Sequence, residues 1–430
     1  MHMHCACKFS QLLVLASWYS SSMKPQQDFF PNKEAGMRSM EHPLVPHALL
    51  DRPEGDVLLL MCGLLTLRTE AAYVLPWVAH HKLMGVDHML LYHDDASGSW
   101  HPKLAIAHKK LLTHLASDES VTFLSMREHN LSSQAQQIGH CTNLTSEIAA
   151  SARHAGAAAW VGNWDMDEVP VMGAPSAGSH SGELPSLKAL LQTLPLDTAG
   201  MYVPRFTFGA APSAELPAAG LLEYEQWTQR LNWHPKGKSL WRAGKAYPVV
   251  AGHSLAMVDS SRQDLKLVLP DGTEATSEWF RPREDASGPE DAHDDASSGR
   301  FAHFSEQQRA MLVSGQEAIP SVAQPLRLCH FELRSVAECR RKQAMFNEIP
   351  NVFPNKTKPY RHDAFSLPCA LRRNSHRRAL QYVVEDSSAL RYAEAVREAL
   401  GKAGRRILRD EQRYLRSHLS TFLVNGTWDF

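Results

Sequence analysis

The sequence predicts an α/β fold, with a mostly parallel, doubly wound central sheet flanked by helices and a helical C-terminal tail. The main observation is that short apolar runs alternate with stretches of helical apolar spacing between residues 57 and 163. This alternation is typical of strands joined by helical crossovers. The second observation is size: 430 residues, 43% hydrophobic and 21% charged, are enough to bury a large core in one or two domains.

The elements of the sheet follow in order along the chain. We expect strands at 57–65, 86–92, 121–124 and 157–163, with helices at 70–84, 104–115 and 134–154 between them. The strands are short apolar runs, whereas the helices repeat apolar residues three and four apart. Gly85 should end the first helix, because glycine is favoured just past a helix C-terminus.

The flanking segments have a different composition. We expect residues 1–55 to hold an anchor or signal-like segment and a proline-rich linker, and 56–370 to form the domain. The apolar run at 9–19 is about eleven residues long, short of the roughly twenty that span a membrane. It fits a signal peptide, the remnant of an anchor with membrane association, or an ordinary buried segment.

Two later segments are strongly charged. Residues 271–300 read as a flexible acidic insertion, and 371–430 as a basic helical tail. In the tail, apolar residues such as Ala393, Val396 and Leu400 share one helical face, and arginines crowd the rest. The basic side is compatible with an acidic glycan, a membrane surface or simple solvation.

Charge and cysteine usage limit the classes of partner and compartment. A formal net charge of -1 gives no overall attraction to nucleic acid. The seven cysteines contain no CxxC pair, which argues against a zinc ribbon, and their odd number allows one or two disulfides without requiring them. Four glycosylation sequons, at Asn130, Asn143, Asn355 and Asn425, indicate the secretory pathway, since chance would give roughly one.

Three acids follow the strand that ends near Asn163. On an extended backbone, Asp165 and Asp167 would project to the same face while Met166 points into the core. Open α/β sheets bind ligands at the carboxyl ends of their strands. Two carboxylates there suit Mg²⁺ or Mn²⁺. The spacing alone would also fit solvated surface acids, but the preceding apolar run favours the metal site.

Other polar residues are candidates for binding a nucleotide. Asp94 and Asp95 follow the second strand, where carboxylates can accept hydrogen bonds from a ribose or base, or can simply form a turn. Glycine-rich phosphate motifs are missing from the sequence. A phosphate must therefore be held by a metal and basic side chains. Lys238 and Arg242 are candidates for the diphosphate or the acceptor, unless they lie on a solvated strand edge.

The order of several blocks resembles glycosyltransferase family 92 over roughly residues 57–350. These blocks are Arg68-Thr69-Glu70, Leu75 to His81, Tyr92-His93-Asp94-Asp95, Gln136-Gln137, Trp164 to Glu168, Val203 to Gly209, Gly237 to Arg242 and His330-Phe331. The sequence departs from the family pattern in two blocks. The usual Lys-Asn-Glu is here Arg68-Thr69-Glu70, where the change at Thr69 bears on contacts to the donor, and Val169 replaces a phenylalanine after the acids.

The resemblance implies a GT-A (Rossmann-like) fold and a metal-dependent, inverting glycosyltransferase. The donor would be a UDP-sugar, with UDP-galactose in the best-known members, and the acceptor a glycan or glycoprotein. Catalysis would take place in the lumen of the Golgi or another secretory compartment. Mn²⁺ or Mg²⁺ on Asp165 and Asp167 would act as a Lewis acid toward the leaving diphosphate.

Roles for further residues come from the same resemblance. It implies that His330 is a third metal ligand, although a packed core histidine would also suit its position, and that Glu70, Asp94, Asp95, Lys238 and Arg242 lie near the donor. Inversion needs a base to take the acceptor proton. The candidates are Glu168, Glu223 and Glu225.

Two other functions are compatible with the same residues. One is a catalytically silent glycan-binding or scaffolding protein that retains the fold, as the change at Thr69 would allow. The other is a metal-dependent phosphoesterase using the same acids. The phosphoesterase is disfavoured because the sequence has no second His and Asp cluster for a two-metal site.

Overall fold

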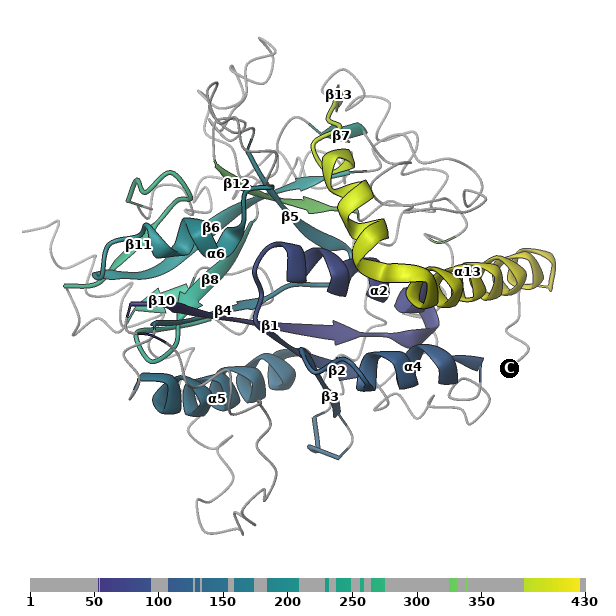
Figure 1. Cartoon of the computed structure of the whole chain (residues 1–430), viewed down its shortest axis with the longest axis horizontal. Helices are drawn as coiled ribbons and strands as arrows, with labels where there is room; N and C mark the ends of the chain where they lie inside the picture. Colours follow the sequence, from purple (N-terminus) through teal and green to yellow (C-terminus); the bar gives the residue numbers. More distant parts are fainter. Residues whose placement is uncertain are drawn as a thin grey trace, which may run out of the picture. The chain divides into compact units, whose positions relative to one another are not determined.

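A nine-stranded mixed sheet forms the centre of the computed structural model (Figure 1). The structure describes residues 53, 55–93, 107–126, 128–131, 134–153, 158–173, 184–208, 229–231, 237–248, 256–258, 264–274, 325–331, 338 and 383–425. The expected anchor and linker at 1–55 and the acidic insertion at 271–300 lie almost entirely outside these residues.

The first half of the sheet is parallel and has the order β3-β2-β1-β4. Its strands are β1 (Val57–Leu65), β2 (His88–His93), β3 (Val121–Ser125) and β4 (Ala158–Asn163). In β1, Leu60 pairs with His88 on one side and with Val161 on the other. The strand is buried on both faces, which explains its unbroken apolar run. The four predicted strands and the α/β fold class are confirmed.

The second half of the sheet is mixed. β8 (Gly237–Arg242) lies antiparallel between β4 and β6 (Thr198–Thr207). β6 also pairs in parallel with β11 (Lys266–Val268) and with β12 (Leu326–His330). β5 (Glu168–Met172) closes the sheet antiparallel to β12. Two small ribbons pair β9 (Ala246–Pro248) with β10 (Ala256–Val258) and β7 (Gln229–Leu231) with β13 (Val383–Glu385).

Helices connect the parallel strands. α2 (Leu67–Leu83) follows β1, α4 (Lys109–Ala116) precedes β3, and α5 (Gln134–Arg153) leads into β4. A short helix, α6 (Leu187–Gln192), precedes β6. α2 ends at Gly85, whose φ of +85° is in the left-handed region that glycine tolerates. The predicted helix end is therefore confirmed.

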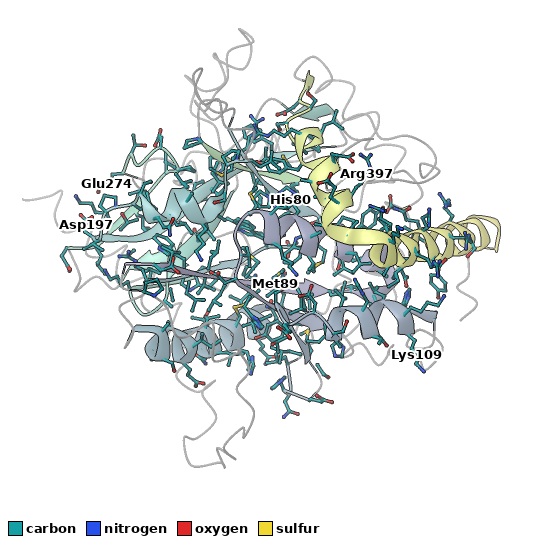
Figure 2. The ribbon with its side chains drawn as sticks, in the orientation of Figure 1. His80, Met89, Lys109, Asp197, Glu274 and Arg397 are labelled. Atoms are coloured by element: carbon teal, nitrogen blue, oxygen red, sulfur yellow. A yellow bond between two sulfur atoms is a disulfide. The ribbon has the colours of Figure 1, made fainter. Side chains whose placement is uncertain are left out.

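The C-terminal helix α13 (Ala393–Asn425) packs against α2 and α4, and Figure 1 shows it crossing over α2. A 3₁₀ turn (Leu390–Tyr392) leads into it, and Gly401 interrupts its helical geometry. α13 therefore covers the outer side of α2. His80 of α2, labelled in Figure 2, is fully buried together with the core residues around it. Within the tail expected at 371–430, the helix spans Ala393–Asn425, whereas Val383–Glu385 form the strand β13 instead.

A disulfide joins Cys62 in β1 to Cys141 in α5, 79 residues apart in sequence. It ties the helix to the central strand beneath it. Cys329, in β12, is buried and is not part of this disulfide. The cysteine count alone neither required nor excluded such a disulfide. Among the described helices, none is both long and apolar enough to cross a membrane.

Candidate functional site

The candidate acids lie on a turn rather than on an extended strand. β4 ends at Asn163 and β5 starts at Glu168, and the Glu168 amide donates to the Asp165 carbonyl at 2.9 Å to close the turn. The expectation that Asp165 and Asp167 extend the strand is therefore wrong. Pro170 lies within β5 and does not end this strand, because proline is tolerated on an edge strand.

The turn is fixed by apolar side chains beneath it. Trp164 and Met166 are fully buried, as expected for Met166. The Trp77 indole N–H of α2 donates to the carbonyls of both Asp165 and Glu168, each at 3.1 Å. Gly63 makes room for this arrangement, since a Cβ there would lie 2.6 Å from the Met166 methyl. The polar side chains of the turn are thus presented from a rigid base.

This turn follows the strand at which the direction of winding reverses. The chain proceeds from β1 outward to β2 and β3, and then returns to place β4 on the other side of β1. Such a switch point opens a crevice at the carboxyl ends of the two central strands, and open α/β sheets bind ligands there. The acids after β4 are therefore at the expected edge of the sheet.

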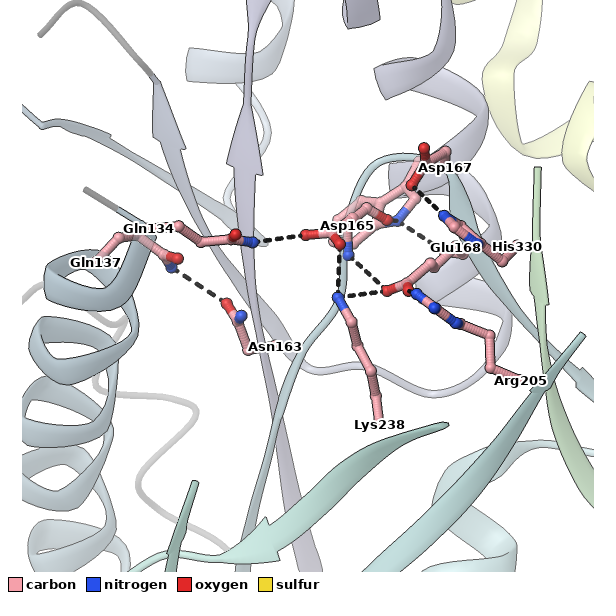
Figure 3. Close-up of polar contacts among 10 residues, drawn as sticks. Gln134, Gln137, Asn163, Asp165, Asp167, Glu168, Arg205, Lys238 and His330 are labelled. Carbon is pink, nitrogen blue, oxygen red and sulfur yellow. Dashed lines mark hydrogen bonds and ion pairs between the residues drawn. The ribbon is translucent and has the colours of Figure 1, made fainter. Parts of the chain in front are cut away.

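Asp165 is held by two side chains from different elements (Figure 3). Gln134, at the start of α5, donates from Nε2 to Oδ1 at 3.0 Å, and Lys238 in β8 donates from Nζ to Oδ2 at 2.7 Å. The Asp165 side chain is nevertheless 27% exposed. It combines a fixed orientation with access to solvent.

Glu168 is completely buried and is paired with two cations. Its Oε1 accepts from the Arg205 guanidinium of β6 at 2.8 Å, and its Oε2 lies 2.6 Å from Lys238 Nζ. The same Oε2 accepts from the Asp165 amide at 2.9 Å. Glu168 thus connects the turn to β6 and β8. This geometry suits an orienting role and leaves little room for proton transfer to an acceptor.

Lys238 is the cation that Asp165 and Glu168 share, and it is buried in the middle of the sheet. Burial lowers the pKa of its ammonium, but attraction to Asp165 and Glu168 outweighs burial and raises the pKa above its ordinary value. Lys238 is therefore charged at neutral pH. The alternative that it sits on a solvated strand edge is wrong, because β8 has neighbours on both sides.

Asp167 and His330 form a second, buried pair in the site. His330 Nε2 at the end of β12 lies 3.5 Å from Asp167 Oδ1, and the Phe331 amide donates to the Asp167 carbonyl at 2.8 Å. Strand pairing fixes the distance, because His330 is opposite Glu168 in the β12–β5 register. Two residues more than 160 positions apart are therefore neighbours, as the resemblance implied.

The chemistry of these donors fits a divalent cation. Asp165, Asp167 and His330 would supply two carboxylates and an imidazole, ligands that Mn²⁺ accepts. Within the described residues, no three such side chains converge as a ready-made cation site. Asp165 would have to exchange its Lys238 contact to join Asp167 and His330 around one ion.

Of the remaining predicted residues, Arg242 and Glu70 are described and have contacts elsewhere. Arg242 lies at the opposite end of β8, where it donates to the Leu196 carbonyl at 2.7 Å and covers the Trp160 ring. Glu70 accepts from the Thr66 amide at 2.7 Å, which satisfies the start of α2. Asp94, Asp95, Glu223 and Glu225 lie outside the described residues.

Three residues of the site had no role assigned from sequence. Gln134 and Arg205 contact Asp165 and Glu168 directly, and Gln137 donates to Asn163 Oδ1 at 3.2 Å beside them. A signal existed for Arg205, an arginine within the otherwise apolar strand β6. Gln134 carried none, because a glutamine at a helix start is common on surfaces.

The fold and the site together define an α/β protein with a Rossmann-like sheet and acids on the turn after β4, at the switch point where sheets of this class bind their ligands. Residues 59–256 match the sequence model of glycosyltransferase family 92. The resemblance to glycosyltransferase family 92 is therefore confirmed over this range. The block His330-Phe331 lies beyond it. Comparisons with curated proteins and with solved structures gave no match.

Proposed function

We propose that this glycosyltransferase uses a divalent metal, Mn²⁺ or Mg²⁺, to transfer a sugar from a UDP-sugar to a glycan or glycoprotein acceptor with inversion. Galactose is the first donor sugar to test. The observation that carries the proposal is the placement of Asp165, Asp167 and His330 at the carboxyl end of β4, next to the switch point.

The protein's own residues would bind and orient. When bound, a divalent cation would supply Lewis-acid stabilisation of the departing diphosphate. Lys238, charged and buried, adds a fixed positive charge at the same place, where it would attract phosphate oxygens. Gln134 keeps Asp165 directed outward, and Arg205 keeps Glu168 in place.

The base for inversion is a separate requirement. A carboxylate must reach the acceptor hydroxyl on the face opposite the diphosphate. Glu168 is fully buried with both oxygens engaged, so we assign it to positioning. Glu223 and Glu225 remain the candidates for the base.

We also propose a secretory-pathway location, the Golgi lumen first. The Cys62–Cys141 disulfide supports it, because such bonds persist in oxidising compartments and are rare in the cytosol. The sequon asparagines Asn130 and Asn143 are both exposed, as acceptors of a glycan must be.

Metal-dependent UDP binding tests the proposal. Purified protein should bind UDP more tightly with Mn²⁺ than with EDTA, and the variant Asp165→Asn/Asp167→Asn should lose that difference. Asp197→Asn/Asp410→Asn is the matched control, since it removes two partly exposed acids outside the site and should retain the difference. Equal UDP binding with and without metal in the wild type would refute the metal dependence.

One observation favours a second candidate, a catalytically silent glycan-binding or scaffolding protein. The Lys238 ammonium occupies a position beside Asp165 where it competes with a metal ion for the carboxylate. The two candidates differ in donor chemistry, because active transferases commonly hydrolyse their donor slowly without acceptor. Donor binding with neither hydrolysis nor transfer across a broad acceptor panel would favour the silent protein.

A further inference from the structure

A band of basic side chains lies along α13 beyond Gly401. We call Lys402, Arg406, Arg409 and Arg413 the basic face. Their spacing of four, three and four residues places them on one side of the helix. All four are exposed, and Arg413 is 75% exposed. At 1.5 Å per residue, the band is about 16 Å long.

The opposite side of the helix determines which side faces outward. Leu400, Leu408 and Leu415 are buried in the core cluster, where α13 packs on α2 and α4. α4 contributes one exposed lysine next to the band, Lys110, whose Nζ lies 3.2 Å from Asp410 of α13. The basic face is thus wider than one helix.

Acidic residues do little to neutralise this surface. Between 402 and 416 the chain has six basic and two acidic residues. Asp410 is shared by Lys110 and Arg413, and Glu411 is buried against His108 at 2.6 Å. Like charges at these helical spacings repel by a few tenths of a kcal/mol each. A chain with a formal net charge of -1 therefore concentrates positive charge on one external surface.

We infer that the basic face binds a polyanionic glycan, of the sulfated or uronate-bearing class. Three of its four cations are arginines, whose planar guanidinium binds sulfate and carboxylate groups through paired hydrogen bonds. A linear array also matches an extended polymer with charges at intervals. α13 lies outside residues 59–256, so this surface is an addition to the matched family domain.

A bilayer is the less suitable partner. Helices that lie in the membrane interface insert an apolar face between the lipids. The apolar face of α13 is already buried against α2 and α4, leaving only charge for a membrane to contact. The inference does not depend on the donor sugar or on the metal.

Heparin binding of the full-length protein tests this inference. The variant Arg406→Gln/Arg409→Gln should weaken heparin binding by about tenfold or more at physiological salt, since each charge near a polyanionic surface contributes about a factor of five. The control Lys245→Gln/Lys266→Gln removes the same charge from the turn before β9 and from β11, and should stay within about twofold of the wild type. UDP binding should be unchanged in both, so this result is independent of the proposed catalytic function.

Three outcomes would overturn the inference. Equal losses in the two variants would show a general charge effect. Absence of heparin binding in the wild type would remove the ligand class. Binding to phosphatidylserine vesicles that depends on Arg406 and Arg409, with no such dependence for heparin, would identify a membrane as the partner.

Discussion

At the scale of single residues, the site is a network in which each carboxylate has a distinct environment. Glu168 is buried between Arg205 and Lys238, whereas Asp165 shares Lys238 but reaches solvent. A buried charge is stable only when it is paired and hydrogen-bonded. The buried charges of Glu168, Arg205 and Lys238 therefore hold the turn, and Asp165 is the carboxylate that a ligand can reach from solvent.

His330 offers a test at this scale. His330→Ala should weaken Mn²⁺ binding by about tenfold or more, the lower end of the loss seen when even an outer-shell partner of a metal ligand is removed. The apo melting temperature should change little, because the side chain borders the site beside Asp167. Metal titration beside an apo melt measures both quantities.

The control for His330 is His88, another buried histidine. His88 bonds Thr122 Oγ1 at 2.8 Å between β2 and β3, away from the acids. His88→Ala should lower apo stability by roughly 1–3 kcal/mol and leave Mn²⁺ affinity intact. Unchanged Mn²⁺ affinity in His330→Ala would remove His330 from the metal site and make it a packing residue.

At the scale of elements, the Cys62–Cys141 disulfide connects the central strand to α5, which also carries Gln134 and Gln137 of the site. Fixing α5 on β1 therefore fixes the side chains that orient Asp165 and Asn163. A bond between residues 79 positions apart removes conformational entropy from the unfolded chain. In the chain-entropy description this stabilises the folded protein by about 4 kcal/mol.

Reduction of the Cys62–Cys141 disulfide should destabilise the protein, so dithiothreitol should lower the urea midpoint of the wild type. Cys62→Ala/Cys141→Ala should be destabilised by a similar amount and should respond to the reductant only through cysteines elsewhere in the chain. Cys329→Ala, which removes a buried cysteine outside this disulfide, is the control. A wild-type midpoint that is insensitive to reductant would show that the bond does not form.

At the scale of the whole molecule, the parallel half of the sheet could be predicted because its signals are local. Each strand is one apolar run, and short crossovers restrict the order in which such strands pair. The turn at Asp165 was missed because β5 exists through pairing with β12, more than 150 residues later. Proline at 170 reads as a strand end unless the edge position of β5 is known.

The same reason limits prediction of the site. Asp165 and Asp167 are recognisable from an apolar run followed by acids, a pattern within ten residues. Lys238 and Arg205 reach Glu168 only because β8 and β6 are aligned with β4 through the sheet. Contacts set by sheet order have no signature in the neighbouring sequence.

Buried histidines make the stability of the molecule depend on pH. Burial lowers the pKa of His80 and of His88 to about 4, and burial with the nearby His129 does the same for His140. Burial, together with the nearby His80, also lowers the pKa of His81 well below its ordinary value. Each stays neutral in the folded protein while its unfolded counterpart takes up a proton near pH 6.5.

The sign of the effect follows from proton binding. Between pH 6.5 and pH 4 the unfolded chain binds more protons than the folded protein. The free energy of unfolding therefore decreases as the pH falls through this window. Above pH 6.5 the stabilising contribution of the neutral histidines is fully present. For His80 the total is on the order of 3 kcal/mol. Urea unfolding at pH 7.5, 6 and 5 should show this loss. His80→Gln retains a donor for the Pro170 carbonyl and should lose about 1.4 kcal/mol less per pH unit than the wild type, and equal slopes for the two proteins would contradict the assignment.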